Sequence, residues 1–293
     1  MREPSATLAE PVEATATPQK TVSIPMNTHS HFISIEGLQL HYELRGSGRP
    51  LVLLHGFAGA AHAWAEVAAE LASDHAVYAL DLVGFGLSDK TTQADVSLAG
   101  HGRRVVALLE ALDLHDVTLA GHSMGGVVAA YAAIADQQPR IARLALLDAN
   151  FYRRNGPPIP MLPFLPRLLA ARFYNPKARA ASLRRCFANP ALVTPERLER
   201  YLAPTRLPGA HAALAAFLAT PSPATYAALP AQISRPTLIL WGEADAIWPL
   251  SDAQRLAQAI PNARLQIIAE AGHMLPEERP LEVAQALREF CGE

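Results

Sequence analysis

The sequence predicts an α/β fold, in which a mostly parallel sheet carries helices on both of its faces. Short and continuously apolar runs recur along the chain, for example at residues 51–54, 117–120 and 238–240, as strands buried on both faces require. Segments with helical period, such as 98–112 and 124–135, lie between most of these runs. The alternation of strand and helix is typical of a parallel sheet that is covered on both sides.

The first elements of the chain are predicted to form a hairpin. Residues 32–36 and 38–44 have strand character and meet at Gly37, which marks a tight turn. After the hairpin, strands and helices are expected to alternate, with strands at 51–54, 76–80, 117–120, 144–147, 238–240 and 265–268 and helices at 61–71, 98–112, 124–135, 250–259 and 280–290.

Residues 151–230 break this alternation. More than half of the 24 prolines fall in this interval, and each proline removes a backbone donor and clashes with the preceding helical turn. Short amphipathic pieces nevertheless remain, and an unstructured loop of this length is uncommon inside a compact domain. We therefore expect a small helical cap inserted between two core strands, with helical pieces at 179–187, 195–201 and 209–218.

The remaining residues divide into an N-terminal arm and the core. Residues 1–31 are rich in Pro, Thr, Ala and Glu without an apolar period, which predicts a flexible arm. The core then consists of residues 32–150 and 231–293. The arm lacks the basic start and apolar stretch of a secretory signal, and no run reaches the roughly 18 apolar residues that span a bilayer. We expect a soluble, cytoplasmic protein without stable membrane insertion.

Charge and cysteine content exclude several kinds of partner. The formal net charge is −2, with 25 basic and 27 acidic residues, so nothing favours binding to nucleic acid. No glycine-rich fingerprint of a dinucleotide site is present. Cys186 and Cys291 are isolated, which favours neither a disulfide framework nor a metal cluster. We expect a small-molecule substrate, no cofactor and no metal, and the oligomeric state stays open.

A Gly-x-Ser-x-Gly segment centred on Ser123 carries the strongest functional signal. Gly121 and Gly125 flank the serine, and the segment lies between the strand at 117–120 and the helix at 124–135. At so sharp a turn, residues two positions away on either side must be nearly without side chains, because strand and helix pass close together. This context predicts that Ser123 is a nucleophile; the alternative is a serine that only shapes the turn.

With this segment the chain resembles the α/β-hydrolase superfamily, and specifically its cap-bearing, esterase-like serine hydrolases. The resemblance covers nearly everything from Phe32 to the C-terminus. It implies a mostly parallel eight-stranded sheet with the cap as a roof over the active site. The motifs that carry it are residues 54–57 (LHGF), 81–89 (DLVGFGLSD), 121–126 (GHSMGG), 241–245 (WGEAD) and 271–273 (AGH).

A serine hydroxyl needs a base, and His273 is the best placed of the 11 histidines. It lies in the loop after the last core strand, at the sheet edge where ligands bind, and the resemblance implies the same position. Asp245 follows the strand at 238–240 and fits the order Ser…Asp…His, so we predict it as the orienting acid. Asp148, at the end of an earlier strand, is its rival.

The remaining site residues surround this group. Backbone N–H groups of Phe57 and Met124 are predicted to form the oxyanion hole. His55 and His122 are expected to border the substrate pocket and to support the neighbouring loops by hydrogen bonding. Trp248 either faces the pocket or anchors the cap. Further apolar lining, or else the core of the cap itself, is expected from Phe151, Tyr152, Leu162, Phe164, Leu165, Leu168, Phe173 and Tyr174.

These residues predict hydrolysis of carboxylic esters of small to medium apolar acids through an acyl-enzyme. Dehalogenases and epoxide hydrolases are disfavoured, because those relatives attack with an aspartate where this chain has Ser123. Carbon–carbon bond hydrolases of vinylogous diketones share cap and triad, although they often carry Asn where His122 stands. Lactones and thioesters are further substrates for the same apparatus. A different hypothesis is a binding or accessory protein with little turnover on the same scaffold.

Overall fold

The computed structural model describes residues 29–152, 164–221, 223 and 225–292 of the chain. Its sheet has eight strands in the order β1-β2-β4-β3-β5-β6-β7-β8. Strand β2 pairs antiparallel with β1 and β4, and every other neighbouring pair is parallel. The prediction of a mostly parallel eight-stranded sheet is therefore confirmed. The strands are β1 (Ser30–Ile35), β2 (Leu38–Arg45), β3 (Arg49–Leu54), β4 (His75–Leu80), β5 (Val117–His122), β6 (Ile141–Leu147), β7 (Thr237–Gly242) and β8 (Ala263–Ile268).

The position of β3 determines where a ligand can reach the sheet. Strand β3 lies between β4 and β5. The chain therefore runs from β3 to its neighbour on one side, β4, and then crosses back past β3 to its neighbour on the other side, β5. Leu54 and Gly121 are register partners at the carboxyl ends of β3 and β5. The loops that leave these two ends diverge, and such a divergence is where open α/β sheets bind ligands. The loop from 55 to 59 and the turn at Ser123 therefore start side by side.

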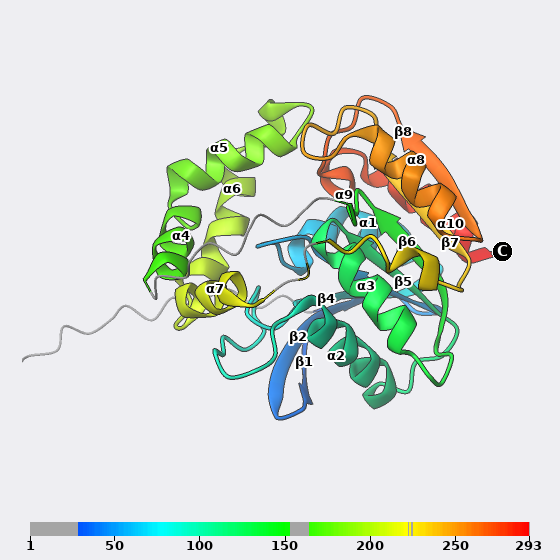
Figure 1. Ribbon diagram of the computed structural model, residues 1–293, viewed down its shortest axis with the longest axis horizontal. Helices are drawn as coiled ribbons and strands as arrows, with labels where there is room; N and C mark the ends of the chain where they lie inside the picture. Colours follow the sequence, from blue (N-terminus) through cyan, green and yellow to red (C-terminus); the bar gives the residue numbers. More distant parts are fainter. Residues whose placement is uncertain (1–28, 153–163, 222, 224, 293) are drawn as a thin grey trace, which may run out of the picture.

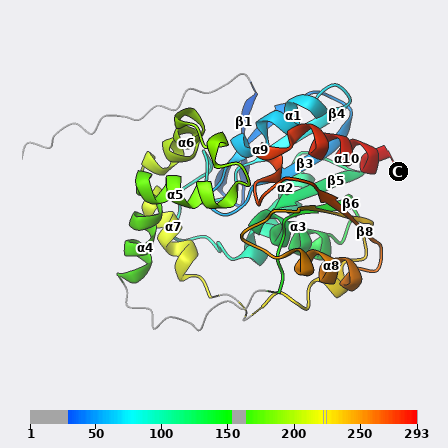
Figure 2. The same cartoon turned by 90° about the horizontal axis from the view of Figure 1, so that it is seen from above.

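Alternate side chains of strand β3 pack into two hydrophobic cores, one on each face of the sheet. Leu51 and Leu53 pack with the cluster that contains α1 and α10, while Val52 and Leu54 pack with the cluster of α2, α3 and α8. Successive side chains of a strand point to opposite faces, so a continuous apolar run serves a sheet that is covered twice. Figure 2 shows these two helical layers. The helices are α1 (Ala65–Leu71), α2 (Leu98–Ala111), α3 (Met124–Ala135), α8 (Leu250–Ala259), α9 (Leu275–Glu278) and α10 (Pro280–Gly292).

Four further helices form what we call the helical insertion, residues 164–221, between β6 and β7. They stand together beside the sheet (Figure 1). Two of them begin with a proline at the first helical position, preceded by a capping side chain: Asn175 accepts from Lys177 N at 3.0 Å and Thr194 from Arg197 N at 3.2 Å. Prolines here start helices and keep them short. The helices are α4 (Leu165–Phe173), α5 (Pro176–Cys186), α6 (Pro195–Leu202) and α7 (Ala210–Ala219).

Most element predictions hold within the described residues, with a few differences. Strand β1 starts at Ser30, so Ser30 and His31 belong to the sheet and not to the predicted arm; residues 1–28 of that arm lie outside the described residues. The helix predicted at 61–71 begins with a 3₁₀ turn, Ala61–Trp64, before α1. Helix α4 was not predicted. Short 3₁₀ turns also occur at Pro190–Leu192, Ala203–Arg206 and Pro230–Gln232.

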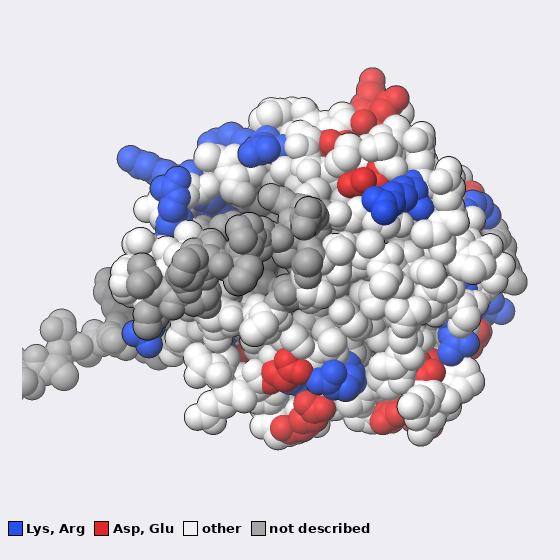
Figure 3. Space-filling view, in the orientation of Figure 1, with Lys and Arg blue, Asp and Glu red and all other residues white. Residues whose placement is uncertain are grey.

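Surface charge is mixed on the face seen in Figure 3, where small acidic and basic groups alternate over the core and basic side chains gather over the helical insertion. The exposed cations of that insertion include Arg172, Lys177, Arg184 and Arg185 on α4 and α5. Among the described helices, none has the length and apolar character needed to cross a bilayer.

Candidate active site

The turn between β5 and α3 holds Ser123 in a strained backbone conformation, with φ 52° and ψ −116°. A Cβ atom added to Gly121 would lie 2.2 Å from the carbonyl oxygen of Gly125. One added to Gly125 would lie 2.5 Å from the carbonyl oxygen of Leu54, on the neighbouring strand. Real Cβ atoms do not make contacts this short, so both positions require glycine. The turn therefore presents the Ser123 side chain at the carboxyl edge of the sheet.

Folding brings Ser123, His273 and Asp245 into one hydrogen-bonded row. His273 Nε2 is 3.0 Å from Ser123 Oγ, and His273 Nδ1 is 2.8 Å from Asp245 Oδ2. The other oxygen of Asp245 accepts from the backbone N–H groups of Ile247 (2.7 Å) and Trp248 (3.0 Å), which fixes the carboxylate. A carboxylate can only accept, so Nδ1 of His273 carries the proton and Nε2 is left to accept from the serine hydroxyl.

Residues 49–280 match the family model described as the alpha/beta hydrolase fold. The chain belongs to the α/β-hydrolase family. The match covers the whole sheet from β3 onward, together with the helical insertion. The protein is accordingly a hydrolase of α/β fold, and its row of serine, histidine and aspartate lies where the strands of that fold end.

Three similar proteins illustrate the range of this family. The uncharacterized hydrolase YugF of Bacillus subtilis is 28% identical over 88% of this chain and 96% of its own. The 2-hydroxymuconate semialdehyde hydrolase of Pseudomonas sp. strain CF600 is 31% identical over 88% of this chain and 92% of its own. Among solved structures, a thermophilic esterase from Thermogutta terrifontis is 30% identical, with a TM-score of 0.73 over 89% of this chain and 97% of its own.

Asp148, the rival acid, lies in the same region of the hydrolase but does not contact His273 as Asp245 does. It is fully buried, and its Oδ1 accepts from Gly242 N at 2.9 Å. Burial, and then the nearby charge of Asp245, raise the pKa of Asp148 well above its usual range. A shift in this direction favours the protonated, uncharged form of Asp148, while Asp245 is the carboxylate that bonds to His273. Side-chain N and O atoms of His122, Asp148 and His273 lie within 4.8 Å of one another. All three residues are buried, and their packing against one another explains this short separation.

The two predicted oxyanion donors border the same space as Ser123. Met124 is the first residue of α3, so its N–H belongs to the free amino end of that helix. Phe57 lies in the loop after β3. Within the described part of the chain, neither N–H has a hydrogen-bond acceptor. Ser123 borders two cavities, and Phe57 and Met124 line the larger of these two, which has a volume of about 610 Å³.

His55 and His122 are both buried and neutral, but they lie in different places. Burial lowers the pKa of His55, which donates from Nδ1 to Gly56 O (2.8 Å) and accepts at Nε2 from Leu82 N (3.1 Å). It fixes the loop after β3, the supporting role expected for it, and among the described residues it lines neither cavity that Ser123 borders. Burial, and then the charge of His273, lower the pKa of His122 to about 3. Its Nε2–H donates to the carbonyl of His273 at 2.6 Å, and its ring lines the smaller cavity.

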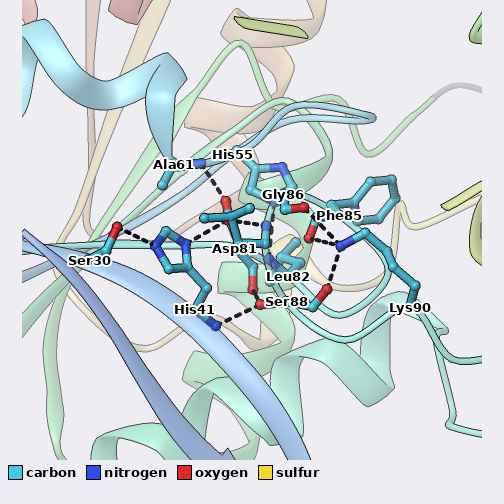
Figure 4. A network of polar contacts seen from close by, with 11 residues as sticks. Ser30, His41, His55, Ala61, Asp81, Leu82, Phe85, Gly86, Ser88 and Lys90 are labelled. Carbon is cyan, nitrogen blue, oxygen red and sulfur yellow. Dashed lines mark hydrogen bonds and ion pairs between the residues drawn. The ribbon is translucent and has the colours of Figure 1, made fainter. Parts of the chain in front are cut away.

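A network centred on Asp81 fixes the loop that follows β4 (Figure 4). The buried carboxylate accepts from Ala61 N (2.6 Å), Leu87 N (2.7 Å) and His41 Nδ1 (2.7 Å). Burial alone would raise the pKa of Asp81, but the hydrogen bond and charge of His41 outweigh it and lower the pKa to about 2. Lys90 closes the same loop by donating to three carbonyl oxygens. Asp81 thus anchors this loop, and it lines neither cavity of Ser123.

Ser123 borders two cavities, one of about 610 Å³ and one of about 240 Å³. Phe57 and Trp248 line both, so Trp248 faces the pocket, and its ring centroid lies 6.2 Å from that of His273. The larger cavity continues toward Val127 and Phe217. A separate cavity of about 660 Å³, between the β1–β2 hairpin and α6, does not include Ser123.

The predicted apolar lining is only partly correct. Phe173 lines the smaller cavity, whereas Phe164 and Leu168 are 61% and 59% exposed to solvent. Phe151 is completely buried in the core, and Tyr174 is buried next to a different, very small cavity. Leu165 and Tyr152 line neither cavity of Ser123 in the described structure, and Leu162 lies outside the described residues.

Sequence reasoning missed two charged residues that border the site, Arg179 and Glu278. Glu278 of α9 accepts from Gly272 N at 3.0 Å and from Ala188 N at 2.8 Å, so it ties the loop of His273 to the segment of the helical insertion that follows α5. Glu278 comes directly after the loop of His273 in the sequence, and this position could have predicted its contact with that loop. Arg179 of α5 lines the smaller cavity, and its sequence neighbourhood gave no sign of this.

Proposed function

We propose that the protein is a serine hydrolase that cleaves carboxylic esters of small to medium apolar acids through an acyl-enzyme. The observation that carries the proposal is the row of contacts from Ser123 Oγ to His273 Nε2 (3.0 Å) and from His273 Nδ1 to Asp245 (2.8 Å). A base in contact with the hydroxyl, and an acid that orients the base, are the requirements for an activated serine.

In this mechanism His273 accepts the proton of Ser123 as Oγ attacks the ester carbonyl carbon. Asp245 stabilises the imidazolium that forms. The negative charge on the former carbonyl oxygen is held by the N–H groups of Met124 and Phe57, and each such donor lowers the barrier by about 2.7–4 kcal/mol. The intermediate then collapses, the alcohol leaves with the proton from His273, and an acyl group remains on Ser123. Water, deprotonated by His273, releases the acid by the same steps.

The lining of the larger cavity supports an apolar substrate. Phe57, Val127 and Phe217 contribute carbon-rich surfaces close to Ser123. Burial of such surface against a ligand is favourable by roughly 25 cal/mol per Å². The cavity also has a volume typical of small-molecule sites. We therefore propose esters with a medium-sized apolar portion as substrates.

A fluorophosphonate probe tests the nucleophile directly. The intact protein should be labelled once, and Ser123→Ala should abolish both labelling and hydrolysis of 4-nitrophenyl esters. Ser251→Ala, which removes an exposed hydroxyl from α8, is the matched control and should behave as the unmodified protein does. An intact protein that takes up no label would favour the binding or accessory role over catalysis.

A carbon–carbon bond hydrolase is the second candidate. It is favoured by the 31% identity to a 2-hydroxymuconate semialdehyde hydrolase over most of both chains. His122 stands against it, because such hydrolases often carry Asn at that position. Rates on 4-nitrophenyl esters of increasing acyl length, measured beside one vinylogous diketone, separate the two. Faster turnover of the diketone would overturn the ester proposal while retaining Ser123 as the nucleophile.

A further inference from the structure

Two buried arginines of the helical insertion differ in what surrounds them. Arg197 is 8% exposed, and carboxylate oxygens of Glu277 and Glu66 lie 3.1 Å and 3.2 Å from its guanidinium nitrogens. Arg179 is only 4% exposed, and its Nη2 donates to the backbone carbonyl of Ala58 at 2.8 Å. In residues 29–152, 164–221, 223 and 225–292, no carboxylate oxygen lies within 4.0 Å of Arg179.

A buried guanidinium without a carboxylate is unusual, because buried charges are costly unless they are paired. Burial lowers the pKa of Arg179, but a guanidinium keeps its proton in proteins, so the charge remains. The rings of Phe173 and Tyr201 contact it, with centroids 4.9 Å and 4.7 Å from Cζ. These contacts hold the group in place but supply no negative charge. The Tyr201 hydroxyl is itself bonded to Glu277, the partner of Arg197.

The unpaired cation faces the reacting centre. Arg179 lines the cavity of about 240 Å³ that also contains Ser123 and His273. Leu183 and Met274 make other parts of this wall apolar. A guanidinium has five N–H donors in a planar fork, and the described protein groups use one of them. Such a fork matches the two oxygens of a carboxylate, and the attraction is strong where water is excluded.

We propose that the acyl chain of the substrate ends in a carboxylate, which pairs with Arg179 while the ester carbonyl lies at Ser123. This inference rests on the serine hydrolase function proposed above and refines its substrate to the monoester of a dicarboxylic acid. The apolar middle of the chain contacts the apolar wall of the smaller cavity, and the alcohol portion occupies the larger one. Arg179 is then a specificity residue, and takes no part in proton transfer.

Two esters of equal length test this pairing, 4-nitrophenyl hexanoate and the mono-4-nitrophenyl ester of adipic acid. With the unmodified protein, kcat/KM should be at least about tenfold higher for the adipate monoester, which corresponds to about 1.4 kcal/mol. Arg179→Gln should bring the ratio of kcat/KM for the adipate monoester to that for the hexanoate close to one, mainly through KM for the adipate monoester, whereas Arg179→Lys should keep part of the preference. Arg200→Gln, which removes an exposed charge from α6, is the matched control and should keep the full preference.

A second measurement needs no variant and so does not depend on the folding of Arg179→Gln. Adipate should protect Ser123 of the unmodified protein from the fluorophosphonate probe at a lower concentration than hexanoate does. Equal protection, or equal rates on the two esters, would overturn the pairing while the nucleophile stands. An equal loss on both esters in Arg179→Gln would also overturn it, and would assign Arg179 to positioning the Ala58 loop. A protein that takes up no label at all would remove the serine hydrolase function and this inference together.

Discussion

The sheet edge and the helical insertion contribute to this site in different ways. At the edge, Ser123 is positioned by the backbone, because Gly121 and Gly125 let strand and helix approach so closely that a side chain at either position would clash. In the insertion, position depends on side-chain contacts, such as those of Arg179 with two aromatic rings and one carbonyl. The edge therefore holds the groups proposed for bond cleavage, and the insertion holds the groups proposed to select the substrate. Changes in the first region should affect rate for every substrate, and changes in the second should affect choice between substrates.

The largest effect is expected from removing the base at the sheet edge. Without the imidazole, the Ser123 hydroxyl loses its proton acceptor, so His273→Ala should lower kcat roughly 10⁴- to 10⁶-fold on every ester. His115→Ala, an exposed histidine, is the control and should leave kcat unchanged. Steady-state rates on the 4-nitrophenyl esters measure both. A loss restricted to one ester would contradict the expectation that the sheet edge affects the rate on every substrate.

Substitutions of the two aspartates at the sheet edge, Asp245 and Asp148, should differ clearly in their effect on kcat. Asp245→Asn removes the charge that orients His273 and should lower kcat about 10⁴-fold. Asp148→Asn keeps the shape of a buried side chain whose raised pKa favours the uncharged form, and should keep kcat within about threefold. Rates for the two variants decide this. Comparable losses in both would show that His273 draws on both carboxyl groups.

Stability should also differ between the two regions. Leu146 of β6 is completely buried, so Leu146→Ala leaves a cavity and should lower the free energy of unfolding by about 2–5 kcal/mol. Leu168 of α4 is 59% exposed, and Leu168→Ala should change it by less than about 0.5 kcal/mol. Urea unfolding of both variants provides the measurement. A large loss at Leu168 would indicate that a further surface covers α4.

The smallest effect concerns the pH dependence of stability at Asp148. Its pKa is raised in the folded state, so the folded protein binds this proton more tightly than the unfolded chain does. The contribution of the group to stability is fully present below its unfolded pKa, about 4, and is lost as the pH rises toward the folded pKa. Relative to the unmodified protein, Asp148→Asn should therefore gain in Tm as the pH increases from 4 to 8. A difference in Tm that is independent of pH would mean that Asp148 is ionised when folded.

Local patterns were sufficient to predict the sheet and the turn that carries Ser123. Apolar runs mark buried strands one by one, and the glycines around Ser123 act within two residues of it, so these features are visible in a short stretch of sequence. The order Ser123, Asp245, His273 along the chain then indicated which strand ends meet. Helix α4 was missed because its region is rich in prolines, which here start helices as well as limit them.

The sequence left open which side chains meet at the site, because that depends on distances between segments far apart in the chain. Asp148 and Asp245 both follow core strands, and only packing shows that the first is buried beneath the site while the second bonds to His273. His55 turned inward to hold its own loop, and Arg179 came to face Ser123 from another layer of the molecule. Backbone conformation is determined by near neighbours, whereas the pairing of a buried charge depends on every element that packs around it. For this reason the sequence by itself determined the turn that carries Ser123, and only the tertiary structure decided which acid meets its base and which cation borders its cavity.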